Sequence, residues 1–530
     1  MPQQVSLPPC PPAARRRRVP AAVVLAAGLG LVGGVAVELL PVVGGDLVAQ
    51  RWWLSWAASA GGQPVDLGWY AGSPAFSYSL LAPWLLALVG PAVAGVLSTA
   101  TGAAATTALL VRAGATRTRT VAVTAVLVFL ADQLSGRTTF ATGTAAALLA
   151  LLVAGDPRIR PPVRRTGAGL LAALAGALSP VSAVLLAVAA GAWWLAGARR
   201  SRSGWEVAAL LAGTATPLAA MVALDAASGP MTASAHQALA ATVASGVVAA
   251  VAGPRLPVVR AGAGLTAALL VGTWLLPDPV GSNATRLVLL FAAPVLVAVP
   301  HRPALLVGLA VALVTWLLPP LVPQDLGPRD TAVQDRASAP VLAELARRGP
   351  VGRVEVVPLA DHSDATMGTQ VPLARGWTRQ LDVARNRLFY DGSLDAASYL
   401  AWLRARGVSY VALSAQRPDW AGRAEAALVR AGVPGVDLVW SDASWSLYAV
   451  DGPGVVLAGP AELVDSDRRG LTVSVQRPGD VLLSVFWDER LVLEGDGCVE
   501  PGDLPGTVRL RMTAAGPVTL TSGWRPAGHC

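Results

Sequence analysis

Long apolar stretches with few charges decide what this chain can fold into. A helix needs about 20 apolar residues to cross the hydrocarbon core of a bilayer, and backbone inside lipid must satisfy its own hydrogen bonds. We therefore expect a mainly α-helical polytopic membrane protein with about eleven transmembrane helices. The stretches fall at about 19–43, 75–111, 120–135, 138–154, 167–179, 181–198, 206–224, 235–253, 261–277, 284–299 and 303–319.

Two of these stretches have unusual features. The stretch 75–111 is too long for one straight span, and Pro83 and Pro91 interrupt it. Because proline disrupts a helix interior, we expect its first part to lie at the membrane surface or to re-enter the membrane. The first stretch follows Arg15 to Arg18 and lacks a convincing cleavage site, so we expect it to stay as a membrane helix.

Basic residues between the apolar stretches predict the topology. Cytoplasmic loops carry the excess of arginine, and with the N-terminus inside, the outer loops hold little beyond Arg51 and Arg137. Ser179 and Pro180 are then the natural tip of a helical hairpin, and the C-terminus lies outside. The net charge of +8 follows from these loops, so we expect no nucleic-acid partner. The expected inner loops hold Arg112, Arg117, Arg119, Arg158, Arg160, Arg164, Arg165, Arg199, Arg200, Arg202, Arg255, Arg260 and Arg302.

A change in acidic content near residue 320 predicts a domain boundary, since most of the 33 acidic residues follow it. Short strands and helices alternate after the boundary, and from about Val455 short apolar strands alternate with Pro-Gly and Asp-Gly turns. These patterns predict an α/β unit followed by a β-sandwich-like module. The predicted parts are a cytoplasmic basic tail (1–18), a transmembrane domain (19–319) with a first outer loop (44–74), an extracytoplasmic α/β domain (320–454) and a β-rich module (455–530).

Three cysteines are present, and two of them lie in the last module. Cys10 is in the N-terminal tail, whereas Cys498 and Cys530 are expected outside the membrane, where a disulfide can form. We predict a bridge between Cys498 and Cys530. The alternative is two free thiols.

The first outer loop holds the most informative polar residues. Asp46 comes just after the first apolar stretch, and residues 46–58 can form an amphipathic helix in the interface, with Trp52, Trp53 and Trp56 at headgroup depth. A carboxylate there can meet a membrane-bound substrate. The alternatives are that Asp46 only caps the helix and that Asp66 is a turn residue.

Short motifs in this loop and beyond resemble the GT-C class of membrane glycosyltransferases, in particular a divergent group from high-GC bacteria. In the loop these are Asp46-x-x-x-Gln50, Trp69-Tyr70-x-Gly72 and Tyr78-Ser79-x-Leu81. Further matches are the segments 136–143, 281–287 and 372–382, and Asn386-x-x-Phe389-Tyr390. Each motif is short, and the resemblance rests on their order along nearly the whole chain.

The resemblance implies a reaction. The donor would be a polyprenyl-phosphate-linked sugar, the acceptor an envelope glycan or lipid, and Asp46 the general base that activates the acceptor hydroxyl. The reaction would invert the anomeric centre, and Arg137 and Arg286 would bind the donor phosphate. For both arginines the alternative is a helix-end side chain that reaches toward the membrane surface.

The resemblance also implies contacts to the sugar or the acceptor. In the first loop and just after it the candidates are Gln50, Asp66, Trp69, Tyr70 and Tyr78. In the expected soluble domain the residue types themselves suggest such contacts, because a tryptophan face suits a sugar ring and polar groups suit its hydroxyls. The candidates there are His362, Arg375, Trp377, Arg379, Gln380 and Asp382. The alternative for this second set is a polar network that packs the domain against the helices.

No cofactor or metal is expected, because the four histidines His236, His301, His362 and His529 are scattered and lack a ligand spacing.

The chain also departs from better-known GT-C members in lacking an obvious paired acidic motif at Asp46. A transporter or flippase for a lipid-linked precursor, and a non-catalytic envelope assembly protein, stay open as alternatives. In every case we expect membrane lipid as a partner and the inner or plasma membrane as the location.

Overall fold

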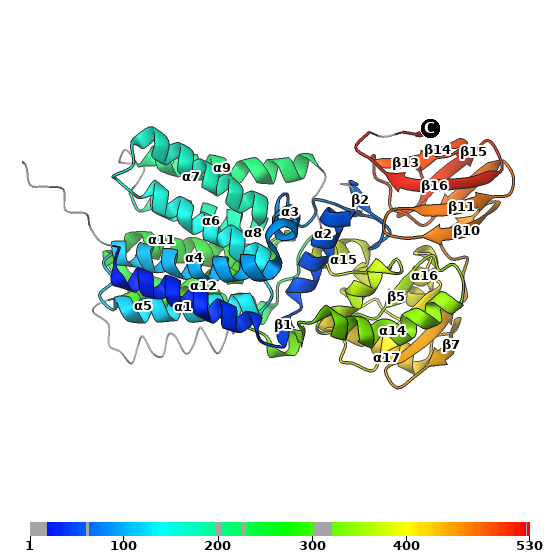
Figure 1. The fold of residues 1–530 in the computed structure, drawn as a ribbon, viewed down its shortest axis with the longest axis horizontal. Coiled ribbons are helices and arrows are strands. Elements are labelled where there is room, and N and C mark those ends of the chain that lie inside the picture. The colour runs from blue at the N-terminus through cyan, green and yellow to red at the C-terminus, as the bar shows by residue number, and fades with distance from the viewer. Residues whose placement is uncertain (1–18, 60–62, 198–202, 225–228, 300–320, 526) are drawn as a thin grey trace, which may run out of the picture.

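The structure is a computed structural model that describes residues 19–59, 63–197, 203–224, 229–299, 321–525 and 527–530. The tail 1–18, which includes Cys10, and the expected span 303–319 lie outside the described residues. The molecule is elongated, with a bundle of long helices at one end and two smaller units side by side at the other (Figure 1).

Long apolar helices occupy the expected stretches, in order, as far as residue 299. Six described segments are long and apolar enough to cross a membrane, among them Gly281–Ala298, which indicates a membrane protein. The number of crossings and the orientation stay predictions. The helices are α1 (Ala21–Glu38), α4 (Pro91–Arg112), α5 (Thr118–Leu134), α6 (Thr138–Ala154), α7 (Pro161–Leu178), α8 (Pro180–Leu195), α9 (Gly204–Ala223), α10 (Ala235–Ala252), α11 (Pro257–Leu275) and α12 (Arg286–Ala298).

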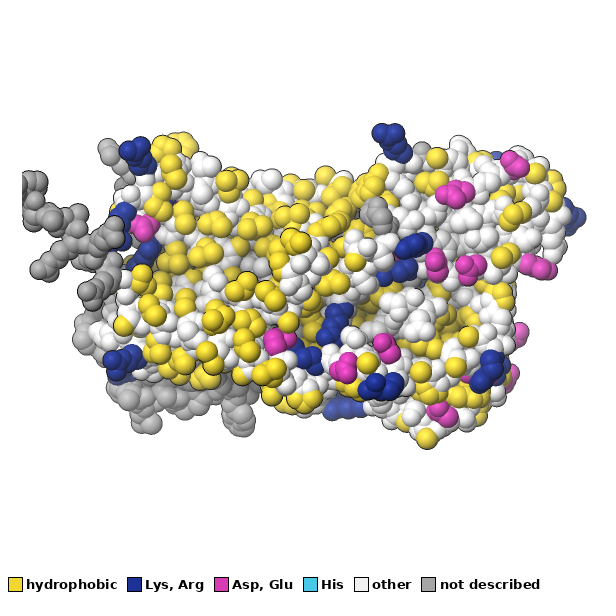
Figure 2. Space-filling view, viewed as in Figure 1, with side chains coloured by type: hydrophobic (Ala, Val, Ile, Leu, Met, Phe, Trp, Pro, Cys, Tyr) yellow, Lys and Arg dark blue, Asp and Glu magenta, His cyan; other side chains and the backbone are white. Residues whose placement is uncertain are grey.

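Small side chains let these helices pack closely. The buried face of α4 consists largely of alanine, glycine, serine and threonine, and it packs against α1, α5 and α6. At Gly102 an added Cβ would come within 2.4 Å of the Phe129 ring on α5. Such small-residue contacts are how helices associate where lipid competes with apolar side chains. Hydrophobic side chains spread over the face of the bundle that Figure 2 shows, and the exposed ones include Leu97, Leu127 and Leu170.

The expected interruption of the stretch 75–111 falls at one of its two prolines. A short helix, α3 (Ala82–Val89), ends at Gly90, and α4 begins at Pro91. Gly90 has a φ of +81°, a conformation that favours glycine and turns the chain between the two helices. Pro83 causes no break because it lies in the first turn of α3, where no backbone hydrogen bond is lost.

The expected surface helix forms as α2 (Asp46–Ser59), but its surroundings were predicted wrongly. Trp52, Trp53 and Trp56 are buried within the protein instead of lying among lipid headgroups. Trp52 stacks on Trp69 with ring centroids 4.2 Å apart, and the α/β domain packs over this cluster. Burial of an aromatic ring removes about 150–250 Å² of its surface from water. Here that surface is buried against protein and not against lipid.

The α/β domain has a four-stranded sheet of order β5-β6-β8-β7, in which only the β5–β6 pair is parallel. Short helices and strands alternate here, as the sequence pattern predicts, and α16 leads into β6. Its elements are η4 (Pro323–Asp325), β4 (Leu326–Pro328), α14 (Thr331–Arg347), β5 (Val354–Val356), η5 (Ser363–Thr369), α15 (Arg379–Arg385), η6 (Arg387–Phe389), α16 (Ala396–Ala405), β6 (Tyr410–Ser414), η7 (Trp420–Gly422), α17 (Arg423–Ala431), β7 (Val436–Ser441) and β8 (Trp445–Val450).

The last part of the chain is a β-sandwich. Two antiparallel four-stranded sheets, β10-β11-β16-β13 and β14-β15-β12-β9, enclose one apolar core. Cys498 on β14 forms a disulfide with Cys530 at the end of the chain. The strands are β9 (Val456–Ala458), β10 (Ala461–Ser466), β11 (Leu471–Val475), β12 (Gly479–Leu483), β13 (Leu491–Glu494), β14 (Gly497–Pro501), β15 (Val508–Met512) and β16 (Gly516–Ser522).

The loop between α1 and α4 joins the three parts. Its first strand, β1 (Val42–Gly44), pairs with β4 of the α/β domain. The hairpin of β2 (Val65–Asp66) and β3 (Ser73–Pro74) holds Asp66, which accepts hydrogen bonds from Arg468 of the β-sandwich. The loop therefore fixes both C-terminal units relative to the helices.

Candidate active site

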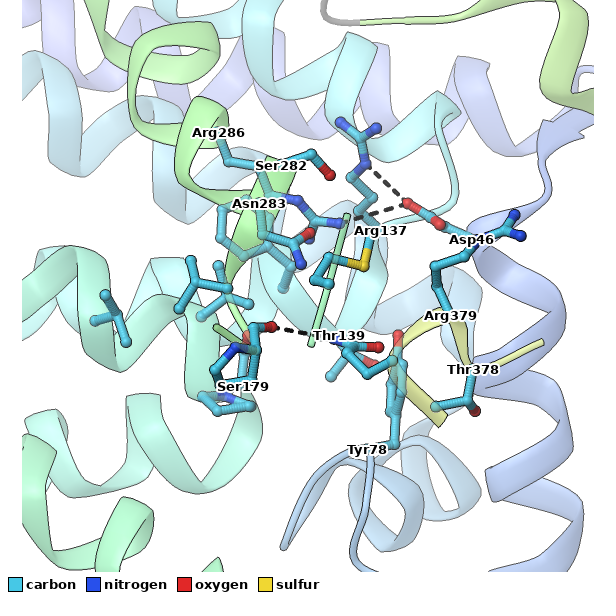
Figure 3. A pocket seen from close by; sticks show the side chains of 18 of the residues that line it. Asp46, Tyr78, Arg137, Thr139, Ser179, Ser282, Asn283, Arg286, Thr378 and Arg379 are labelled. Carbon is cyan, nitrogen blue, oxygen red and sulfur yellow. Dashed lines mark hydrogen bonds and ion pairs between the residues drawn. The ribbon is translucent and has the colours of Figure 1, made fainter. Parts of the chain in front are cut away.

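A cavity of about 550 Å³ lies where the helical bundle meets the C-terminal units. We call this end of the bundle the domain-facing end; it includes the C-termini of α7 and α9 and the N-termini of α6, α8 and α12. The helix ends, the first loop and residues 377–380 of the α/β domain line the cavity (Figure 3). It therefore draws on segments that are far apart in sequence.

Asp46 reaches this cavity from the first turn of α2. The backbone before it is held tightly, since Gly45 donates a hydrogen bond to the Asp325 carbonyl. A Cβ at Gly45 would come within 2.6 Å of the His362 ring, so a glycine is needed for this close approach. The Asp46 side chain is 30% exposed, which leaves it open to a molecule in the cavity.

Two arginines meet the Asp46 carboxylate. Arg137 Nε donates to Asp46 Oδ2 at 2.9 Å, and an Arg286 terminal nitrogen lies 3.7 Å from the same oxygen (Figure 3). Arg137 precedes α6, and Arg286 begins α12 with its guanidinium 4.7 Å from the Phe140 ring centroid. Two cations on one side of a cavity form a ready site for an anion such as phosphate.

The same two arginines set the charge of Asp46. Burial raises the pKa of the Asp46 carboxyl, but the Arg137 and Arg286 guanidinium groups outweigh that effect and leave the pKa below its ordinary value. Asp46 is thus ionised at neutral pH and can accept a proton. Burial and the nearby Asp46 charge raise the pKa of the Tyr78 hydroxyl, which stays protonated as a hydrogen-bond donor.

Gln50 links α2 to the start of α6. Its amide nitrogen donates to the carbonyls of Asp46 and Gly136, and its amide oxygen accepts from the Thr139 backbone at 2.7 Å and hydroxyl at 2.9 Å. Its side chain is buried and fully used in these bonds. The resemblance gave Gln50 a sugar contact, whereas its geometry suits holding Asp46 and Arg137 in register.

The cavity has one apolar and one polar side. Among the described residues, the apolar lining comes mainly from α8, α9 and α12, and the polar lining comes from the first loop, α6, the start of α10, η3 (Gly281–Thr285) and the α/β domain. Apolar lining residues are Val181, Val184, Leu218, Met221, Val222 and Leu289; polar ones include Tyr78, Thr139, His236, Gln237, Ser282, Asn283 and Thr378.

Part of the predicted sugar-binding segment faces the cavity. Trp377, Arg379 and Gln380 line it. His362 stacks on Trp377 with ring centroids 3.4 Å apart, and burial lowers the pKa of His362 to about 4, so its ring is neutral. Arg379 donates to Asp419 at 2.6 Å, which fixes its guanidinium beside the Trp377 ring.

The other half of that segment is buried away from the lining. Arg375 makes a two-pronged hydrogen bond to Asp382 and a further one to Glu425, all within the α/β domain. For Arg375 and Asp382 the geometry favours the alternative of a polar packing network. A sugar would have to displace these buried bonds to reach them.

Three first-loop candidates also have internal partners. Asp66 is buried and paired with Arg468, and Trp69 is stacked on Trp52 with its indole nitrogen bonded to the Ala365 carbonyl. Tyr70 donates to the Gly376 carbonyl at 2.5 Å. Asp66 thus ties the loop to the β-sandwich, whereas Trp69 and Tyr70 hold it under the α/β domain, beside Trp377.

Several lining residues had not been singled out from the sequence. Ser282 and Asn283 lie in the 281–287 motif, so the resemblance gave a signal for them. His236 and Gln237 at the start of α10 carried none, because nothing in the sequence relates them to Asp46. Among the described residues, no group of three His, Cys, Asp or Glu side chains is arranged to hold a metal ion.

Two solved structures are similar to this chain. The arabinofuranosyltransferase AftD from Mycobacteria matches with a TM-score of 0.42 and 14% identity, over 94% of this chain and 60% of that chain. ArnT from Cupriavidus metallidurans, in the apo state, matches with a TM-score of 0.34 and 14% identity, over 82% of this chain and 99% of that chain. No protein-family model and no curated protein matches the chain.

Proposed function

We propose that this protein is a membrane glycosyltransferase of the GT-C type. It transfers a sugar from a polyprenyl-phosphate donor to an envelope glycan or lipid acceptor on the extracytoplasmic face. The observation that carries the proposal is the meeting of Asp46, Arg137 and Arg286 at one cavity between membrane helices and soluble units.

The arrangement suits an inverting displacement at the anomeric carbon. Asp46 takes the proton of the acceptor hydroxyl, and the acceptor oxygen forms a bond to the anomeric carbon. The bond from that carbon to the phosphate oxygen breaks on the opposite face, and its electron pair leaves with the polyprenyl phosphate. Arg137 and Arg286 stabilise the charge of the departing phosphate, since a fixed guanidinium needs no reorganisation when the charge develops.

The two sides of the cavity match the two chemistries of such a donor. The apolar side, on α8, α9 and α12, suits isoprenoid units entering from lipid. The polar side, with Trp377, Gln380 and Asn283, suits a sugar ring and its hydroxyls. Asp46 and the two arginines line the same cavity and meet one another there, and the bond to be broken would sit beside them.

The placement of charges gives no support to the transporter reading. Charged side chains on the described membrane helices lie near the helix ends, for example Glu38 at the end of α1 and Glu206 at the start of α9. Transporters usually place such groups near the middle of the membrane.

The proposal is tested in the native host with a deletion strain complemented by wild type, D46N or D391N. Asp391 is an exposed carboxylate outside the cavity lining and serves as the matched control. Loss of an envelope glycan and accumulation of polyprenyl-phospho-sugar in the deletion and D46N strains, with D391N normal, supports the proposal. A deletion defect that D46N repairs fully points to the non-catalytic assembly role, and an unchanged profile in the deletion strain overturns the proposal.

A further inference from the structure

Exposed apolar side chains lie on α4 and on the short helix that precedes it. Val93 and Leu97 on α4 are exposed, and on the adjoining α3 Leu88 is 83% exposed. Only Gly90 separates α3 from α4, which is long and apolar enough to cross a membrane. Exposed apolar side chains on a spanning helix face lipid, so α3, which adjoins the N-terminus of α4 and exposes Leu88, belongs at the edge of the bilayer.

A row of aromatic rings leads from α3 to the end of the β-sandwich. Trp84 on α3 stacks on Phe76 with centroids 5.5 Å apart, and Phe76 contacts Trp524 at 5.6 Å. Trp524 follows the end of β16, separated from it by Gly523. Despite these ring contacts, Trp84 stays 38% exposed and Trp524 stays 50% exposed.

A second exposed tryptophan lies at the same end of the bundle. Trp274, followed by the exposed Leu275 and Leu276, is in the last turn of α11, just before the cavity-lining residues Pro279 and Val280. Tryptophan is enriched where hydrocarbon meets headgroups, since its ring is apolar and its N–H seeks a polar partner. Trp84 and Trp274 thus mark one membrane surface, and Trp524 is linked to Trp84 through the Phe76 ring.

We propose that Trp524 and the exposed Arg525 form a membrane contact of the β-sandwich, and that the partner of this surface is the lipid bilayer itself. The Trp524 ring lies among the headgroups next to Trp84, and the Arg525 guanidinium pairs with lipid phosphates. The contact requires only that the chain is a membrane protein, so it holds whether or not the proposed sugar transfer is correct.

The contact has a consequence for the cavity. Phe76, which Trp524 touches, is followed directly by Ser77 and Tyr78, both of which line the cavity. Ser79 is held at the C-terminus of α7, where its hydroxyl donates to the Leu178 carbonyl at 2.9 Å. A β-sandwich seated on the membrane therefore fixes the segment that carries Tyr78 from both ends.

Spin labels test the membrane contact in the full chain. In a C10S background, Cys498 and Cys530 stay in their disulfide, so W524C, R525C and L438C each present a single thiol. Leu438 is an exposed residue on β7, on the side of the α/β domain away from the helices, and serves as the control (Figure 1). R525C keeps Trp524 and so reports on the site even if W524C does not fold.

The labelled proteins are placed in nanodiscs of phosphatidylethanolamine and phosphatidylglycerol. At 524 and 525 we expect collisions with oxygen to exceed those with a water-soluble nickel complex, with a ratio several-fold above that at 438. Labels at 524 and 525 that are as accessible to nickel as the label at 438 would overturn the proposal.

Discussion

The Asp46 carboxylate accepts a hydrogen bond from Arg137 at 2.9 Å, across 91 positions of sequence. The bond joins the first turn of α2 to the residue before α6, and Arg286 adds a second cation from α12. In this arrangement the carboxylate sits beside the cations that a donor phosphate would need. Binding of the donor phosphate must therefore change the electrostatic environment of Asp46.

Removal of either arginine should weaken binding of polyprenyl phosphate. Charge-assisted hydrogen bonds contribute about 1.5–3 kcal/mol, so R137A and R286A should each raise the Kd about 10- to 100-fold. The matched control is R112A, because Arg112 is an exposed arginine that pairs with Asp156 at the other end of the bundle. Native mass spectrometry or calorimetry in nanodiscs measures the Kd. An equal rise in Kd for R112A would show that the effect comes from the helical bundle as a whole and not from the cavity.

Phosphate binding should be coupled to proton uptake by Asp46. In the free protein Arg137 and Arg286 hold the pKa of Asp46 below its ordinary value. A bound phosphate offsets their charge and adds a negative neighbour, so the pKa of Asp46 rises and protons are taken up at mildly acidic pH. Calorimetry of polyprenyl phosphate binding in buffers of different ionisation enthalpy measures the uptake. It should vanish in D46N, and equal uptake by D46N would exclude Asp46 as its source.

Replacement of Gln50 should lower both the stability of the protein and the rate of sugar transfer. Q50L keeps the approximate volume but leaves the buried Thr139 amide without its acceptor, at a cost of about 1–3 kcal/mol in the free energy of unfolding. We expect a lower Tm and reduced sugar transfer. S59A, at the exposed end of the same helix, is the control. A Q50L protein with unchanged Tm would show that these bonds do not hold α2 to α6.

The α/β domain should lose stability as the pH rises. Burial raises the pKa of Asp364 to about 8, although its carboxylate accepts a hydrogen bond from the Leu359 backbone at 2.9 Å. The folded state keeps a proton that the unfolded state releases near its ordinary pKa of 3.8, so stability from this group is full below about pH 4 and is lost as the pH rises toward about 8.

Thermal unfolding between those pH values measures this effect. D364N carries no titrating proton, and its stability should vary less with pH than that of wild type. D437N, at an exposed carboxylate on β7, should keep the wild-type dependence. Parallel pH curves for wild type and D364N would contradict the assignment.

The sequence predicted the helices well because hydropathy and helix length are local properties. Ser179 and Pro180 were expected at a hairpin tip, and α7 and α8 meet there. The surroundings of α2 could not be predicted in the same way. An amphipathic tryptophan face suits a lipid surface and a protein core equally, and only the packing of the α/β domain decides between them.

The same limit applies to the candidate site. Arg375 and Arg379 are four positions apart and chemically alike, yet one is buried among carboxylates and the other lines the cavity. Their neighbours Glu425 and Asp419 come from much later in the chain, so no local pattern separates the two roles. His236 and Gln237 were missed because they reach the cavity only through the arrangement of the helices.

The most direct test of the central claim is turnover by D46N. Wild type and D46N are supplied with labelled polyprenyl-phospho-sugar and an acceptor extract from the native envelope, and release of free polyprenyl phosphate is measured. A general base contributes about 10²- to 10⁴-fold, so D46N should turn over slower by that factor while still binding polyprenyl phosphate. Turnover by D46N at the wild-type rate would contradict the account.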